Sequence, residues 1–347
     1  MLRSTWTSSS THRTPLKTNE YASLVYTHGR SRRLHPIKMH LNIFTTLTLA
    51  ASTATSAMIP QPEARAATQD FRSISFNIRY AASASTYERP WSTRGPLVIS
   101  QLKNAASTAT SSSSIPIIGL QEVLYQQLQD IKSGLGSSWT HLGTGRDDGK
   151  QAGEFVPLLY QPGVLNLVNS TQKWLSPTPD VPSFWPGAGS RRYVIVAVFE
   201  VIKNGKRIIV ANTHLDNASQ TARVEGIKVA LKTIKDVRTT YGNDLGIILT
   251  GDFNSEPGTG DAYGTTDADG LVDELYNLAA VNQRFGPYGT FSGFNPNAEP
   301  NTRIDFVWLG PNASSTWAVK RYEVVSNVVG GVYISDHRAV VGDVTLR

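Results

Sequence analysis

The feature that most constrains this chain is a series of short apolar segments, each with a polar, chemically competent residue at one end. Six such segments are spread over residues 71–346. Their polar residues, in chain order, are Asn77, Gln121-Glu122, His214 with Asp216, Asp252 with Asn254, Asp305, and Asp336-His337. Because strand ends gather at the edge of a sheet, these carboxylate, amide and imidazole groups predict one shared polar pocket.

Strand patterns outnumber helix patterns in the sequence. Alternating or continuous apolar runs predict strands at Phe71–Ile78, Ile115–Leu120, Phe155–Tyr160, Tyr193–Ile202, Arg207–Asn212, Leu245–Thr250, Ile304–Leu309, Tyr322–Val325 and Ala339–Leu346. Helices are expected at Leu124–Ile131, at about Ser219–Tyr241, and at Leu271–Ala279 with Asp269 as its N-cap. Many strands without strict alternation with helices favour an α+β layered sandwich over a doubly wound parallel sheet.

The composition restricts what the pocket can hold. None of the 347 residues is cysteine, which excludes disulfide scaffolds, zinc fingers, iron–sulfur sites and thiol nucleophiles. Oxygen ligands without thiolates favour a hard cation, Mg²⁺ or Mn²⁺. Such a cation beside carboxylates and two histidines favours attack of water on a phosphoester. No apolar run reaches the roughly 20 residues of a membrane-spanning helix.

The N-terminal residues have the composition of targeting segments. The chain carries 33 Lys and Arg against 27 Asp and Glu, a net charge of +6, and residues 1–38 hold seven of those bases and one acid. Residues 39–57 combine a basic flank, an apolar stretch and small residues, which is typical of a secretory signal peptide. We therefore expect a basic extension (1–38), a signal peptide (39–57), a spacer (58–69) and one catalytic domain (70–347).

Two expectations follow from this division. Secretion is favoured over a mitochondrial address, because the apolar stretch and the cleavage site occur in the right order. The N-glycosylation motifs at Asn169, Asn217 and Asn312 fit a secreted chain. Because residues 39–347 are formally neutral, the net charge of the chain is no indication of nucleic-acid binding.

Six motifs resemble those of the endonuclease/exonuclease/phosphatase superfamily, the group that includes DNase I. They are FNIRY (76–80), GLQEV (119–123), NTHLD (212–216), GDFNSEP (251–257), RIDFVW (303–308) and SDHRAVV (335–341). The resemblance implies a four-layer αββα sandwich with its site at one end of the two packed sheets. Within the superfamily, the chain looks like a small fungal and bacterial subgroup related to the carbon catabolite repressor protein 4-type nucleases.

The resemblance also implies a role for each motif residue. Glu122 would bind the metal, with Asn77 and Asp336 as direct or water-mediated ligands. Asp252 would orient or deprotonate the attacking water, and Asn254 would position that water or the phosphate. His337, held by Asp305, would contact the scissile phosphate, while His214 would donate to a non-bridging oxygen. Taken singly, several of these residues could be turn or cap residues; the order of all six motifs favours a catalytic set.

Arg79, Arg146, Asp216 and Arg191 are candidates for substrate binding, although a solvated turn explains Arg146 in the loop 145–150 equally well. The leading hypothesis is a monomeric, metal-dependent phosphodiesterase. Within the same superfamily, the substrate is either a nucleic acid, for nuclease or exonuclease action, or a small phosphate ester. A phosphate-binding pseudoenzyme is the alternative from another class. Asn217 stands where many relatives have histidine, and we expect its glycosylation motif to be unoccupied or the substrate to be small.

Overall fold

The computed structural model describes residues 68–82, 86–295 and 302–347. Every described residue belongs to one compact unit. The expected basic extension, the signal peptide and all but the last two residues of the expected spacer lie outside the described residues. The first strand begins at Gln69, one residue before the start expected for the catalytic domain.

Two mixed β-sheets form the centre of the described unit. Within the described residues, the first sheet has seven strands in the order β10-β12-β15-β1-β2-β4-β3. Their bounds are β10 Arg284–Phe285, β12 Trp317–Val324, β15 Val340–Leu346, β1 Gln69–Asn77, β2 Ile115–Gln121, β4 Leu158–Tyr160 and β3 Thr140–Leu142. Strands β1 and β2 are parallel, whereas β15 runs antiparallel to β1.

The second sheet has six strands among the described residues, in the order β5-β6-β7-β8-β11-β9. Their bounds are β5 Leu165–Trp174, β6 Tyr193–Val201, β7 Arg207–His214, β8 Gly246–Asp252, β11 Asp305–Gly310 and β9 Asp273–Glu274. Strands β7 and β8 are parallel, and β11 is antiparallel to β8. A separate hairpin joins β13 Val328–Val329 to β14 Val332–Tyr333.

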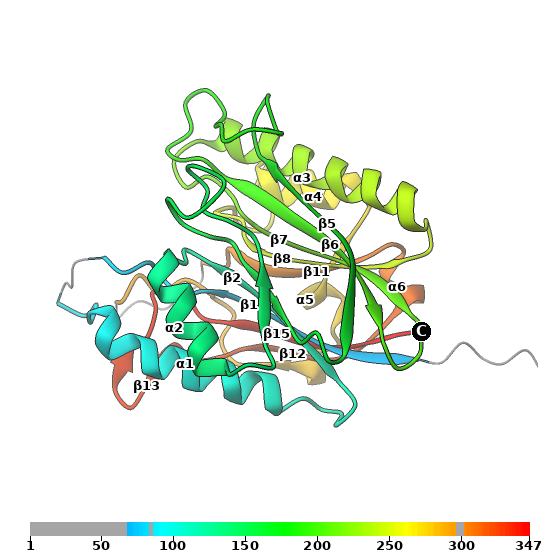
Figure 1. The fold of residues 1–347 in the computed structure, drawn as a ribbon, viewed down its shortest axis with the longest axis horizontal. Helices are drawn as coiled ribbons and strands as arrows, with labels where there is room; N and C mark the ends of the chain where they lie inside the picture. The colour runs from blue at the N-terminus through cyan, green and yellow to red at the C-terminus, as the bar shows by residue number, and fades with distance from the viewer. Residues whose placement is uncertain (1–67, 83–85, 296–301) are drawn as a thin grey trace, which may run out of the picture. The chain divides into compact units, whose positions relative to one another are not determined.

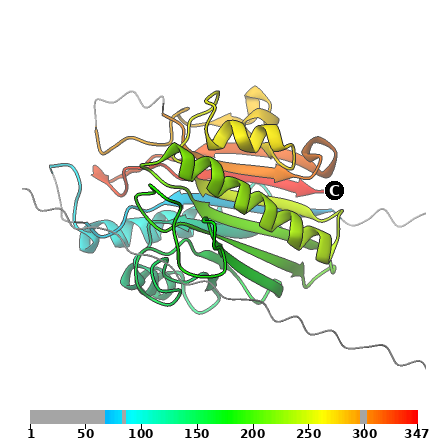
Figure 2. The same cartoon turned by 90° about the horizontal axis from the view of Figure 1, so that it is seen from above.

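Helices cover the outer faces of both sheets, so that four layers lie one on another (Figure 1). The described helices are α1 Trp91–Ser107, α2 Tyr125–Leu135, α3 Gln220–Tyr241, α4 Ala262–Asp269, the short α5 Leu275–Leu278 and α6 Ala313–Thr316, and the 3₁₀ turn η1 Val281–Gln283. Helices α1 and α2 share a buried cluster with β1 and β2. Helices α3 and α4 share one with β6, β7, β8 and β11, and Figure 2 shows them lying across that sheet.

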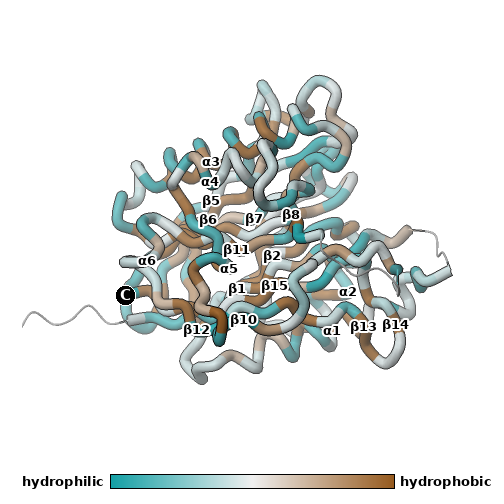
Figure 3. Tube along the Cα trace, turned by 180° about the vertical axis from the view of Figure 1, so that it is seen from behind, coloured by the Kyte–Doolittle hydropathy of each residue, from teal (hydrophilic) through white to brown (hydrophobic). Residues whose placement is uncertain are grey.

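A third apolar cluster fills the space between the two sheets. It contains Phe71 and Ile117 of the first sheet and Phe199, Val210 and Ile248 of the second, all almost fully buried. The apolar stretches of the sheet strands are visible in the hydropathy-coloured trace (Figure 3). A sheet with two apolar faces needs cover on both sides, and here one face packs on the partner sheet and the other on helices. The predicted four-layer αββα sandwich is confirmed.

The helix predictions were partly wrong. Residues 271–279 form β9 and the four-residue α5 instead of one helix, and the expected N-cap Asp269 is the last residue of α4. Gly270 adopts a left-handed conformation (φ 69°) that ends α4 and redirects the chain. The sequence patterns also failed to indicate α1 and α4. Helix α1 contains Pro96, and its buried face includes the polar Arg94 and Gln101, so it lacks a clean apolar stripe.

The strand predictions were better, with errors at boundaries and edges. Strand β5 was not predicted, because most of its residues are only half-buried and the sequence NLVNSTQ shows no apolar alternation. Strand β4 begins at Leu158, three residues after the expected start, and β12 begins five residues earlier than expected. In the described part of the chain, no helix combines the length and the apolar character needed to cross a membrane.

Candidate active site

The register of the strands brings the predicted residues to one end of the two sheets. Asn77 is the last residue of β1, and His214, the last of β7, lies beside Asp252, the last of β8. Since β11 runs antiparallel to β8, its first residue, Asp305, also lies beside Asp252. The Ser335 hydroxyl donates to the main-chain oxygen of Asn77 over 2.7 Å and thereby fixes the segment before β15 at the same place.

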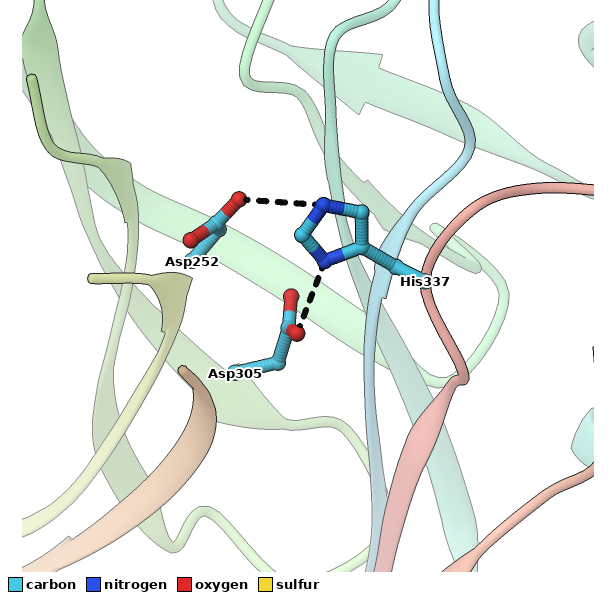
Figure 4. A group of neighbouring side chains, drawn as sticks. All are labelled: Asp252, Asp305 and His337. Atoms are coloured by element: carbon cyan, nitrogen blue, oxygen red, sulfur yellow. Dashed lines mark hydrogen bonds and ion pairs between the residues drawn. The ribbon is translucent and has the colours of Figure 1, made fainter. Parts of the chain in front are cut away.

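His337 lies between two buried carboxylates (Figure 4). Its Nδ1 donates to Asp305 Oδ2 over 2.9 Å, and its Nε2 lies 3.7 Å from Asp252 Oδ2. Burial by itself would lower the pKa of His337, but the charges of Asp305 and Asp252 raise it well above the usual value. His337 is therefore an imidazolium at neutral pH, as expected for a histidine paired with an aspartate.

Asp252 is fully buried and accepts hydrogen bonds at both oxygens. Asn77 Nδ2 donates to Oδ2 over 2.9 Å, and the main-chain N–H of Asn254 donates to Oδ1 over the same distance. Burial, followed by the charge of Asp305, raises the pKa of Asp252 to about 7. A carboxylate with a pKa near 7 can accept a proton from water far more readily than an ordinary aspartate.

The environment of His214 is opposite in charge to that of His337, because arginines and not aspartates surround its ring. The Arg192 guanidinium donates to His214 Nδ1 over 2.7 Å, and because arginine has no acceptor, the proton of the neutral imidazole is on Nε2. That Nε2 lies 3.4 Å from Asp252 Oδ2. Burial, followed by the charges of Arg192 and Arg146, holds the pKa of His214 well below its usual value. His214 is thus a neutral hydrogen-bond donor aimed at the site.

Glu122 and Asp336 form the pair that best fits a divalent cation. Both line the pocket, and Asp336 is largely buried with a pKa raised first by burial and further by the negative charge of Glu122. Asn77 donates to Glu122 Oε1 over 3.1 Å, while its own oxygen accepts from the main-chain N–H of Arg79. Two close carboxylates that repel each other suit a hard cation. In this arrangement Asn77 orients Glu122 through its N–H groups.

A second set of buried residues is an alternative metal site to this pair. Asp252, Asp305 and His337 offer one ligand atom each within 4.8 Å of one another. However, His337 Nδ1 and Asp305 Oδ2 already share a hydrogen bond of 2.9 Å. A cation there would displace the Asp305–His337 hydrogen bond, so the residues present fit a metal better at Glu122 and Asp336.

Three site residues hold strained backbone conformations. Arg79 and Glu122 have φ values of 59°, and Asn254 has a φ of 48°, all in the left-handed region. Such conformations cost about 1–3 kcal/mol each for residues other than glycine and persist where surrounding contacts fix them. Each of the three immediately follows a strand or lies within two residues of one, so the strain turns its side chain towards the pocket.

The comparisons with known proteins agree with this geometry. The model of the Endonuclease/Exonuclease/phosphatase family matches residues 74–337, which include the first five motifs whole and the sixth as far as His337. The chain belongs to this family. No curated protein matches the chain significantly.

Several solved structures share the fold over nearly their whole length. The family member from Bacteroides vulgatus is 30% identical, with 80% of this chain and 100% of that chain covered and a TM-score of 0.71. The Bacteroides thetaiotaomicron protein described as a mannosyl-6-phosphatase is 29% identical, with 79% and 99% covered and a TM-score of 0.69. The catalytic domain of human Nocturnin is 18% identical (80% and 95% covered, TM-score 0.61) and shows the fold alone.

His214, Asp252 and His337 line a pocket of about 390 Å³. Of the predicted substrate-binding residues, Arg79 and Arg146 line it. Asp216 does not; it accepts from the main-chain N–H groups of Gly189 and Ser190 and fixes that loop. Arg191 does not line it either, because its guanidinium faces Asp147 and the ring of Phe184.

The pocket is also lined by Glu154, Ser190, Arg192 and Asn217, which we call its polar wall. No signal in the sequence indicates Glu154 or Ser190. Arg146 Nη1 donates to Glu154 Oε2 over 2.6 Å, and Arg192 Nη2 donates to Asn217 Oδ1 over 3.2 Å. Burial raises the pKa of Glu154. Arg191 and Arg192 are adjacent in the segment just before β6, and their contacts show that only Arg192 points into the pocket.

Proposed function

We propose that this chain is a divalent-metal-dependent hydrolase of small, hydroxyl-rich phosphate esters, with sugar phosphates as the substrate class. The pocket carries the proposal. Its volume of about 390 Å³ is at the lower end of the range for small-molecule sites. Beyond the catalytic residues, the polar wall of Glu154, Ser190, Arg192 and Asn217, together with Arg146, offers hydrogen-bonding groups. Charged and amide groups with both donors and acceptors suit the hydroxyls of a polar leaving group.

The chemistry follows from the protonation states. Asp252, with its raised pKa, accepts a proton from the attacking water, and Asn254 adjoins it to position that water. The imidazolium of His337 and the Nε2–H of His214 donate to phosphate oxygens as negative charge develops on them. Mg²⁺ or Mn²⁺ held by Glu122 and Asp336 would supply further positive charge that polarises the phosphate.

Two further observations support a small ester over a nucleic-acid strand. Outside residues 1–38, the chain has 26 basic and 26 acidic side chains, whereas polynucleotide binding relies on a surplus of Lys and Arg. A relative at 29% identity is described as a mannosyl-6-phosphatase. The second candidate, phosphodiester or nuclease action, is favoured by Tyr80 and Phe291, two rings in the pocket that could stack on a base.

The test is hydrolysis by the purified full chain, followed as inorganic phosphate from the sugar phosphates, as p-nitrophenol from the diester and as shortened oligomer from the RNA. Mannose 6-phosphate, glucose 6-phosphate, bis-p-nitrophenyl phosphate and a single-stranded RNA oligomer are compared with Mg²⁺, with Mn²⁺ and with EDTA. We expect metal-dependent release from the sugar phosphates, lost by about 10³-fold or more in Asp252→Ala. Asp236→Asn, on the exposed face of α3, is the matched control and should keep full activity. Faster cleavage of the RNA or the diester would replace the small-ester proposal with the second candidate.

We also propose that the protein is secreted and that residues 39–57 act as its signal peptide, which is removed. Asn217 bears on this proposal, because its side chain accepts from Arg192 inside the pocket and a glycan there would crowd the substrate. We expect the active secreted protein to carry no glycan at Asn217. Intact-mass analysis of protein secreted by a eukaryotic host checks this, and a glycan on Asn217 of fully active enzyme would contradict it.

A further inference from the structure

Directly beneath the site, buried polar side chains join the two sheets. We call Ser75, Gln121, Asn212 and Thr250 the inter-sheet polar layer; each is at most 1% exposed. Three of them precede a site residue by two positions on the same strand: Ser75 precedes Asn77 on β1, Asn212 precedes His214 on β7, and Thr250 precedes Asp252 on β8. Because side chains repeat every two residues along a strand, each lies one step below its site residue on the same face.

Asn212 is the centre of this layer and uses its full hydrogen-bonding capacity. Its Oδ1 accepts from Gln121 Nε2 over 2.8 Å and lies 3.0 Å from the Thr250 hydroxyl. Its Nδ2 donates to the main-chain oxygens of Leu120 and Pro157 over 2.9 and 3.1 Å. Since those two oxygens can only accept, the orientation of the amide is fixed. Asn212 of the second sheet thus forms hydrogen bonds with three residues on the β2 and β4 side of the first sheet, namely Leu120, Gln121 and Pro157.

A glycine opposite Asn212 allows this close approach of the sheets. A Cβ atom on Gly119 of β2 would lie 2.7 Å from Asn212 Oδ1 and closer still to the Thr250 hydroxyl. No side chain therefore fits at position 119 unless the sheets move apart. The missing side chain at Gly119 and the hydrogen bonds of Asn212 are independent observations that point to the same short distance between the sheets.

The stability of the fold does not explain why this layer is polar. Below it, the same space between the sheets is filled by apolar side chains such as Val210 and Ile248. Burying polar groups costs free energy even when they are paired, and well-packed apolar side chains often stabilise as well or better. Hydrogen bonds, unlike apolar contacts, are directional and fix both the distance and the register of the groups that they join.

We infer that the inter-sheet polar layer positions the two halves of the active site, with Asn212 as its key positioning residue. Asn77 ends β1 and Glu122 follows β2 in the first sheet, and His214, Asp252 and Asp305 belong to the second. The 2.9 Å hydrogen bond from Asn77 to Asp252 crosses between the sheets and depends on their spacing. This inference rests on the proposed function for its kinetic readout, while its structural readout is independent of any activity.

The experiment compares Asn212→Leu with Val210→Ala, one step lower on the same face of β7. In Asn212→Leu we expect kcat to fall about 100-fold with KM changed by less than about twofold, since small displacements of reacting groups act on this scale. A crystal structure of this variant should show the distance from Asn77 Nδ2 to Asp252 Oδ2 lengthened beyond hydrogen-bonding range. Val210→Ala should lower the melting temperature and leave kcat and that distance unchanged.

Thr250→Val and Thr250→Ser keep the test open if Asn212→Leu does not fold. Valine matches the shape of threonine without its hydroxyl, so we expect reduced kcat in Thr250→Val and its recovery in Thr250→Ser. Wild-type kcat together with an unchanged Asn77–Asp252 distance in Asn212→Leu would overturn the inference. If the wild-type chain hydrolyses no phosphoester, the proposed function fails, and the crystallographic distance alone then decides the positioning role.

Discussion

The two sides of Asp252 hold histidines in opposite environments. On one side, His337 lies among carboxylates, and its Nε2 is 3.7 Å from Asp252 Oδ2. On the other side, His214 lies against Arg192, and its Nε2 is 3.4 Å from the same oxygen. The pKa of His337 is raised well above its ordinary value by the surrounding acids, and the pKa of His214 is lowered by burial and by the arginines.

This difference teaches that one residue type can fill two roles in a single site when its neighbours differ. A cation between carboxylates can stabilise an anion and later give up a proton, whereas a neutral imidazole fixed as its Nε2–H tautomer can only donate a hydrogen bond. The two sequence motifs identify these histidines but do not indicate their protonation states. The protonation state of each histidine depends on its contacts in the folded chain.

The largest effect should come from the acidic side. In Asp305→Asn, the amide cannot hold His337 as an imidazolium, and we expect kcat to fall by about 10³-fold or more, as for other Asp–His pairs in hydrolases. Calorimetry should show a folded variant with a melting temperature near that of the wild type. Unchanged kcat in the folded variant would mean that the charge of His337 plays no part in turnover.

A smaller effect should follow on the arginine side. Arg192→Met removes the donor to His214 Nδ1, whereas Arg192→Gln retains an N–H that can reach it. We expect the methionine variant to lose about 10- to 100-fold in kcat, the value of one hydrogen bond to a charged group, and the glutamine variant to lose less. Steady-state kinetics on both variants checks this, and equal losses would refute a role for the hydrogen bond to Nδ1.

The smallest effect concerns stability and a third histidine. His141, on the short strand β3, has its pKa lowered to about 4, first by burial and then by Lys132. Its folded-state pKa lies below the unfolded value of about 6.5, so its contribution to stability is complete above pH 6.5 and is lost as the pH falls towards 4. We expect His141→Gln to flatten the fall in unfolding free energy between pH 6.5 and 4, measured by urea denaturation. An identical pH slope in the variant would show that His141 is not buried as described.

The strand ends could be predicted from the sequence because apolar runs with a period of two and terminal polar residues are local signals. Register in the parallel pairs then places Asn77 beside Gln121 and His214 beside Asp252, which a strand pattern anticipates. The packing of the two sheets brings these pairs together. The same reasoning could not find α1. Its buried face includes Arg94, which donates to the main-chain oxygens of Ile78 and Ile334, so a charged side chain stands where the pattern requires an apolar one.

Part of the polar wall could not be predicted from the sequence, for a different reason. Arg191 and Arg192 are adjacent and chemically identical, and only their contacts in the folded chain show that Arg192 points inward. Glu154 was not predicted because its ion pairs with Arg146 of its own loop and with Arg192, which is far along the chain, appear only in the folded structure. Long-range packing, which no local pattern contains, decides which of these side chains reach the substrate.

The most direct test of the opposite environments of His337 and His214 is to measure their protonation states at pH 7.0. These are read from the imidazole ¹⁵N chemical shifts of the full chain in EDTA. His337 and His214 are assigned with the variants His337→Gln and His214→Gln. We predict two protonated ring nitrogens for His337 and, for His214, a neutral ring with its proton on Nε2. A neutral His337, or a charged or Nδ1-protonated His214, would contradict the division of roles between the two sides of Asp252.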